Sequence, residues 1–159
     1  MPEFSRIMRI IVVGAVAAGA LTVGTAGAHA AAPGVATRGV RIAEIYFDSA
    51  GPDDGSNRSL DREWVKVVNT TNVRKNISGW TVHDSSSHRY TFRRTVLAPH
   101  AAIRLHTGRG RRNADNRYWG STSYIWNNAG DTARLGNASG LVVGRCSYSS
   151  AFDSVRKFC

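Results

Sequence analysis

The chain has 159 residues, and its 21 Lys and Arg against 11 Asp and Glu give a formal net charge of +10. That length suits one domain with a real hydrophobic core, and no internal repeat or low-complexity tract argues for a solenoid or a disordered chain. The positive charge concerns solubility and partners, above all polyanions, and not the fold. The 18 Arg against 3 Lys suit phosphate recognition, but a GC-rich genome produces the same ratio.

Residues 1–30 have the three parts of a secretory signal peptide. Arg6 and Arg9 make a positive start, residues 10–23 carry no charge, and Ala28-His29-Ala30 offers small residues where a signal peptidase cuts. A membrane span needs about 20 apolar residues, which this run does not reach. We therefore expect export with cleavage after Ala30 and a mature net charge of about +9, since one positive charge net is removed. Met8 is an alternative start.

Short alternating segments follow a flexible lead over residues 31–38. The β-branched and aromatic runs predict strands at 40–47, 63–69, 79–84, 88–92, 102–107, 124–126, 131–137 and 141–147. Turn residues separate them, and no segment after residue 39 keeps a helical period over three turns. Short strands at this spacing are typical of an all-β sandwich or barrel.

An acidic loop at residues 48–63 stands out in this basic chain. Five carboxylates and Asn57 lie within it, and hard oxygen ligands on a glycine-bearing loop suit Ca²⁺. The candidate ligands are Asp48, Asp53, Asp54 and Glu63. The residue order of an EF-hand loop is absent, and Asp, Asn, Ser and Gly are also ordinary turn residues. A solvated loop therefore remains the alternative.

The histidines and serines do not form a catalytic pattern. His83 and His88 flank a turn, where they could face each other across a hairpin or stand exposed at strand ends. Neither an HExxH motif nor a Cys/His cluster accompanies them, and the chain has no G-x-S-x-G sequence. We predict no catalytic residue.

An arginine-rich run precedes the last strands. Arg109, Arg111, Arg112 and Arg117 lie among glycines and asparagines. Such a loop could contact phosphates without reading bases, so these four are the candidate polyanion ligands. A charged loop that only keeps the protein soluble is the alternative.

Trp119 and Trp126 follow this run. Their rings could be an exposed platform for a sugar or a base, or could fill the core of a small sandwich.

Cys146 and Cys159 are the two cysteines. Behind a signal peptide, an even cysteine count predicts a disulfide. This one would hold the tail, residues 149–159, against the domain.

Taken together, these motifs resemble the lamin tail domain family, in its secreted bacterial branch. The resemblance rests on GVRIAEIYF at 39–47, NTTN at 69–72, ISGW at 77–80, YTF at 90–92, LAP at 97–99 and WNNAGDTARL at 126–135, and it covers residues 39–148. It implies an immunoglobulin-like β-sandwich with Trp80 in the core and the segment around Trp126 as scaffold. It brings no catalytic residues.

The resemblance also implies an interaction module. Family members serve this role in lamins, for nuclear partners and DNA, and in bacteria often beside exported hydrolases; this chain shows neither a coiled-coil rod nor a hydrolase domain. We expect a secreted, non-enzymatic module, extracellular or bound to the cell wall, without a cofactor unless the acidic loop binds Ca²⁺. Its partner would be a protein or an anionic envelope polymer. The alternatives are weak, sequence-indifferent nucleic-acid binding through the arginine loop and a metal-dependent hydrolase.

Overall fold

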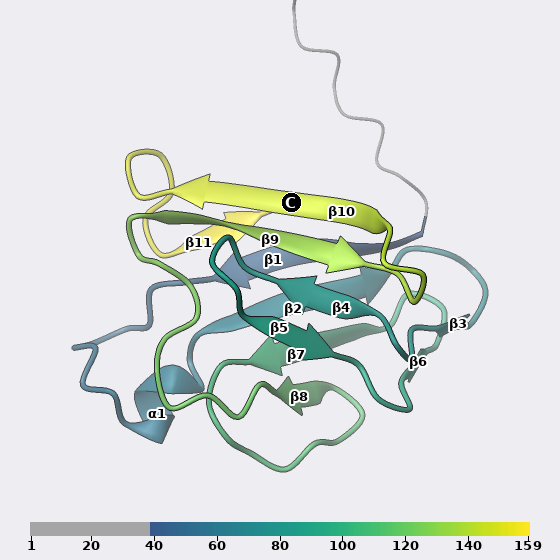
Figure 1. Ribbon diagram of the computed structural model, residues 1–159, viewed down its shortest axis with the longest axis horizontal. Helices are drawn as coiled ribbons and strands as arrows, with labels where there is room; N and C mark the ends of the chain where they lie inside the picture. Colours follow the sequence, from purple (N-terminus) through teal and green to yellow (C-terminus); the bar gives the residue numbers. More distant parts are fainter. Residues whose placement is uncertain (1–38) are drawn as a thin grey trace, which may run out of the picture. The chain divides into compact units, whose positions relative to one another are not determined.

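The computed structural model describes residues 39–159, so the expected signal peptide and lead lie outside the described residues. Two sheets face each other as a sandwich (Figure 1). The five-stranded sheet has the order β11 (Arg156–Phe158), β1 (Val40–Tyr46), β2 (Trp64–Asn69), β7 (Ala102–His106) and β8 (Asn116–Tyr118). The four-stranded sheet has the order β10 (Val142–Ser149), β9 (Gly130–Gly136), β4 (Thr81–His83) and β5 (Arg89–Thr91). The predicted all-β immunoglobulin-like sandwich is confirmed.

Smaller elements complete the domain. A two-stranded ribbon joins β3 (Lys75–Asn76) to β6 (Val96–Leu97), and one short helix, α1 (Asn57–Leu60), lies in the acidic loop. Ser56 caps this helix, because its side chain accepts a hydrogen bond from the Ser59 amide. Within residues 39–159, no helix is long and apolar enough to cross a membrane.

Alternation of side chains along the strands builds the core. In β2, Val65 and Val67 are fully buried between the sheets, while Trp64 and Lys66 point to the outer face. This follows from the two-residue period of a strand, which sends successive side chains to opposite faces. The other strands add the remaining apolar side chains of the core, among them Ile45, Val82, Ile103, Ala133 and Leu135.

Several elements differ from the prediction, which also lacked β3, β6 and α1. The segment at 124–126 is not a strand, although Ile125 and Trp126 are buried. β8 lies inside the arginine-rich run, and β11 lies in the C-terminal tail. Both are three-residue edge strands whose partners, β7 and β1, supply the pairing. Three residues are too few to show an alternating pattern of apolar and polar side chains, so the sequence did not predict these two strands.

The tryptophans of the stretch 118–126 belong to the scaffold. Trp126 is only 2% exposed, and Trp119 packs against it edge to face with ring centroids 6.2 Å apart. Such a perpendicular arrangement is favourable for aromatic pairs. Trp80, expected in the core, is half-buried and packs against the core from its margin.

The disulfide between Cys146 and Cys159 is present, as predicted. Cys146 lies in β10 of one sheet, and Cys159 directly follows β11 of the other, so the bond links the two sheets at one side of the sandwich. The tail is held by its backbone as well, because the Cys159 amide donates to the Ala43 carbonyl at 2.9 Å. The tail is therefore an integral edge of the fold.

Candidate functional site

The acidic loop does not gather its carboxylates into one ligand set. Asp48 and Asp53 both accept hydrogen bonds from the side-chain amide of Asn128, at 3.5 and 2.9 Å. Asp54 instead accepts from the Ser56 amide at 2.9 Å, and hydrogen bonds from Ser56 lower the pKa of Asp54. Over residues 39–159, no three His, Cys, Asp or Glu side chains are grouped where they could hold a metal ion.

Glu63, the fourth expected calcium ligand, has a structural role. It is completely buried, and its two carboxylate oxygens accept hydrogen bonds from the amides of Ile125 (3.1 Å) and Trp126 (2.8 Å). These two bonds take the place of the strand-to-strand hydrogen bonds that a strand at 124–126 would make. Burial raises the pKa of Glu63 to about 7, although the two amides lower it.

The histidines of the β4–β5 hairpin do not face each other. The His83 ring bonds to the Thr81 hydroxyl at 3.0 Å, and its cross-strand partner is Arg89. Nδ1 of His88 lies 2.5 Å from a carboxylate oxygen of the buried Asp84. The two rings therefore serve separate local contacts.

The arginine-rich loop between β7 and β8 has a fixed backbone. The Asn57 side chain accepts from the Arg109 amide at 2.7 Å and donates to the Arg109 carbonyl at 2.9 Å. Gly110 lies directly on the Tyr118 ring, since a Cβ added there would come within 2.2 Å of a ring carbon. Only glycine permits this close approach. Asn57 and Gly110 thus attach the loop to α1 and to β8.

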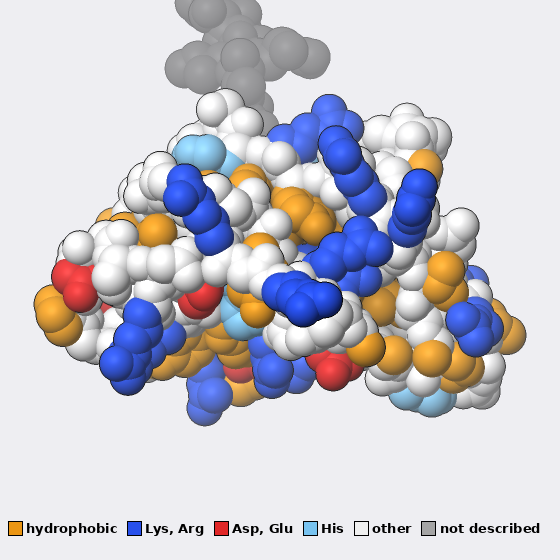
Figure 2. All heavy atoms as spheres, turned by 90° about the horizontal axis from the view of Figure 1, so that it is seen from below, with side chains coloured by type: hydrophobic (Ala, Val, Ile, Leu, Met, Phe, Trp, Pro, Cys, Tyr) orange, Lys and Arg blue, Asp and Glu red, His pale blue; other side chains and the backbone are white. Residues whose placement is uncertain are grey.

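Three of the four expected arginines project from this loop. Arg109, Arg111 and Arg112 are exposed, and none of them takes part in an ion pair of the described residues. Figure 2 views the molecule from below relative to Figure 1, toward the side where β8 and α1 lie, and shows many Lys and Arg side chains and few acids there.

Arg117 departs from the expectation. It is 8% exposed, and its guanidinium donates to the carbonyls of Asn113 and Asn116 and to the Thr95 hydroxyl. Burial lowers the pKa of Arg117. The Arg117 side chain therefore supports the loop from inside, and its assignment as a polyanion ligand was wrong. Arg117 lies in β8 with its side chain facing inward, which accounts for the difference from the other three arginines.

The three exposed arginines lie within four consecutive positions of one loop. We call Arg109, Arg111 and Arg112 the basic edge.

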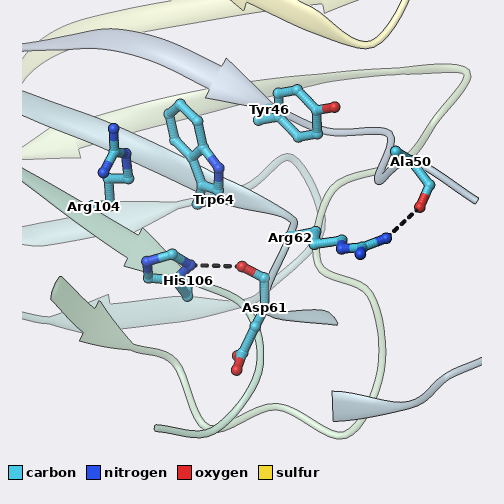
Figure 3. A pocket seen from close by; sticks show the side chains of 7 residues that line it. All are labelled: Tyr46, Ala50, Asp61, Arg62, Trp64, Arg104 and His106. Atoms are coloured by element: carbon cyan, nitrogen blue, oxygen red, sulfur yellow. Dashed lines mark hydrogen bonds between the residues drawn. The ribbon is translucent and has the colours of Figure 1, made fainter. Parts of the chain in front are cut away.

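A hollow of about 440 Å³ opens beside this edge, on the outer face of the five-stranded sheet. It is lined by Tyr46, Ala50, Asp61, Arg62, Trp64, Arg104 and His106. Figure 3 shows Tyr46 and Trp64 side by side with Arg104 beyond Trp64, and Arg62 reaching toward the Ala50 carbonyl, to which it donates at 2.7 Å.

Aromatic side chains form a row across this face. Strand register places Tyr46 beside Trp64, Trp64 beside His106, and His106 beside Tyr118. Tyr46 and Trp64 have ring centroids 5.7 Å apart, and His106 and Tyr118 have centroids 5.1 Å apart, with nearly parallel planes in both pairs. The row ends at Tyr118 under Gly110, so the hollow and the arginine loop are neighbours.

A comparison with known families agrees with this architecture. The Lamin Tail Domain family matches residues 33–150. The chain belongs to the lamin tail domain family. No curated protein matches the chain.

The aromatic row of this lamin tail domain was missed by sequence reasoning. Its members come from four strands, and successive members are separated by 12 to 42 positions in the sequence, at 46, 64, 106 and 118. Each stands at an outward position near a strand end, where a single aromatic residue is unremarkable. Only the register of the four strands makes them neighbours.

Proposed function

We propose that this lamin tail domain is a secreted, non-enzymatic interaction module that binds anionic polymers through its basic edge. The observation that carries the proposal is the fixed loop bearing Arg109, Arg111 and Arg112, none of which forms an ion pair within the described residues. A loop already held in one conformation loses little entropy on binding, so more of the interaction energy appears as affinity.

Export is part of the proposal. The disulfide between Cys146 and Cys159 is the kind of bond that persists in an oxidising compartment, and it supports a location outside the cytoplasm. The signal-like features of residues 1–30 point in the same direction. The anionic polymers within reach of such a protein are those of the cell envelope and its surroundings.

Binding at this edge would act through charge. Guanidinium forks pair with phosphate, sulfate or carboxylate groups, and such contacts carry no sequence information. Affinity for duplex DNA should fall steeply with salt, because each phosphate contact releases counterions. The domain would therefore hold a polymer without selecting a sequence.

Salt titration of binding tests this proposal. We would measure duplex DNA binding between about 20 and 200 mM salt for the mature protein and for a variant with Arg109, Arg111 and Arg112 changed to alanine. The log–log slope should become shallower by about three, at about 0.9 per phosphate contact.

A matched control loses the same charge elsewhere, through Arg41→Ala, Arg74→Ala and Arg145→Ala. It should keep more of the slope than the loop variant. Equal slopes for the two triple variants would show that the charge acts diffusely, and the proposed site would be abandoned.

A further inference from the structure

The hollow beside the basic edge has aromatic and cationic lining without an available acid. Its one carboxylate belongs to Asp61, which points away from the other labelled side chains in Figure 3 and accepts a hydrogen bond from Asn57 at 2.9 Å. The main-chain carbonyl of Asp61 bonds to His106 at 2.6 Å. The surface available to a ligand therefore consists of aromatic rings and guanidinium groups.

Two arginines give this hollow its charge. Arg104 is exposed, with its guanidinium carbon 5.1 Å from the centre of the Trp64 ring, and Arg62 is exposed beside the Ala50 carbonyl. Neither is in an ion pair of residues 39–159. Arg62 and Arg104 can therefore meet an anion. Tyr46 stacks on Trp64 and Arg104 lies over the Trp64 ring, so an apolar, flat group would extend this stack.

The direction of the row matters as much as its composition. The four rings cross β1, β2, β7 and β8, which covers about 14 Å at the usual spacing between strands. Three of the rings, those of Tyr46, Trp64 and His106, line the hollow, and the fourth, that of Tyr118, lies under the arginine loop. A chain that follows the row would meet rings and guanidinium groups along one continuous path.

We infer that this path binds a single-stranded nucleic acid, with an unpaired base extending the stack of Tyr46 on Trp64 and with phosphates on Arg62, Arg104 and the loop. The inference rests on the proposed function and names its ligand. A single strand combines flat rings with a regular phosphate chain, which matches the lining, and its bases are free to pack on aromatic side chains. In a duplex the base faces are covered by their neighbours, so only the phosphates remain available.

Ligands that differ only in their rings test the inference in the unmodified protein. Fluorescence anisotropy at low salt would compare a 15-nucleotide oligothymidine, an abasic oligonucleotide of equal length, a duplex and heparin. We expect the oligothymidine to bind at least about tenfold more tightly than the abasic chain, as stacking of one base typically contributes. Equal affinities would overturn the inference.

Variants then locate the preference. Trp64→Ala should bring the oligothymidine to the affinity of the abasic chain and leave abasic binding unchanged. Phe152→Ala is the matched control, because Phe152 is 90% exposed and lies outside the hollow. A Trp64→Ala protein that keeps the thymidine preference would overturn the inference, provided its melting curve shows a folded domain. The ligand comparison in the unmodified protein stands even if that variant does not fold.

The outcomes separate this inference from the proposed function. If the affinity for every ligand depends on the loop arginines but the bases of the oligothymidine add no affinity, the polymer-binding function is supported and the single-strand inference is wrong. If heparin binds most tightly and depends on Trp64, the hollow recognises an acidic polysaccharide and the inference is again wrong. If no ligand binds, the proposed function fails as well.

Discussion

Glu63 gives a pH-dependent test of how the domain is held together. Burial raises the pKa of Glu63 from its usual 4.5 to about 7. Between these values the unfolded chain has lost the proton while the folded domain keeps it, so stability falls as pH rises through this window. Each pKa unit corresponds to about 1.4 kcal/mol, which makes the loss about 3 kcal/mol.

Glu63→Gln removes this titration and keeps the shape of the side chain. A protonated glutamate can still accept from the amides of both Ile125 and Trp126, because its hydroxyl oxygen keeps a lone pair, whereas the NH2 group of glutamine cannot accept and meets one amide donor to donor. The variant should therefore be the less stable protein at pH 4, by an amount that does not change with pH. Between pH 4 and pH 8 the difference in free energy of unfolding should shift by about 3 kcal/mol in favour of the variant, since glutamine does not bury a charge.

Urea unfolding followed by tryptophan fluorescence measures this difference at pH 4, 5, 6, 7 and 8. Subtracting the variant from the parent cancels the titration of the other groups. Thr122→Ala, an exposed change on the same segment, is the control and should give a difference that does not vary with pH. A difference that stays constant for Glu63→Gln, or that favours glutamate as pH rises, would show that the two amide bonds outweigh burial.

Other properties follow from particular contacts. Reduction of the bond between Cys146 and Cys159 should add two hydrogens to the intact mass and cost about 3 kcal/mol of stability in urea unfolding; two thiols titrating in the untreated exported protein would contradict it. Gly110→Ala should weaken polyanion binding, because the added Cβ meets the Tyr118 ring and displaces the loop, whereas Ala114→Gly in the same loop should have less effect; anisotropy titrations would show this, and equal affinities would mean that the loop conformation is unimportant. Millimolar Ca²⁺ or chelator should leave the melting temperature unchanged, since the acids of residues 48–63 are not assembled as a ligand set; a clear rise with Ca²⁺ would restore the metal site.

The local pattern of the sequence determined the fold class. Alternation in residues 64–69 sends valines inward and larger or charged side chains outward, and this period of two already predicts a half-buried strand. The disulfide was equally predictable, because an even cysteine count behind a signal-like segment favours a bond between the two cysteines. The exposed Arg109, Arg111 and Arg112 came from composition, as glycine-rich charged runs lie at surfaces.

Tertiary structure decided what those elements do. In the sequence, Glu63 is one of five acids in residues 48–63. Only the packing of the domain places its carboxylate where it accepts hydrogen bonds from the amides of residues 125 and 126. Arg117 reads like its neighbours in the loop until pairing of β8 with β7 turns it inward. The aromatic row exists only through the register of four strands, which brings together residues up to 72 positions apart, from Tyr46 to Tyr118. Periodicity describes neighbours along the chain, whereas a binding face depends on which strands lie side by side, and that choice is made by the packing of the whole domain.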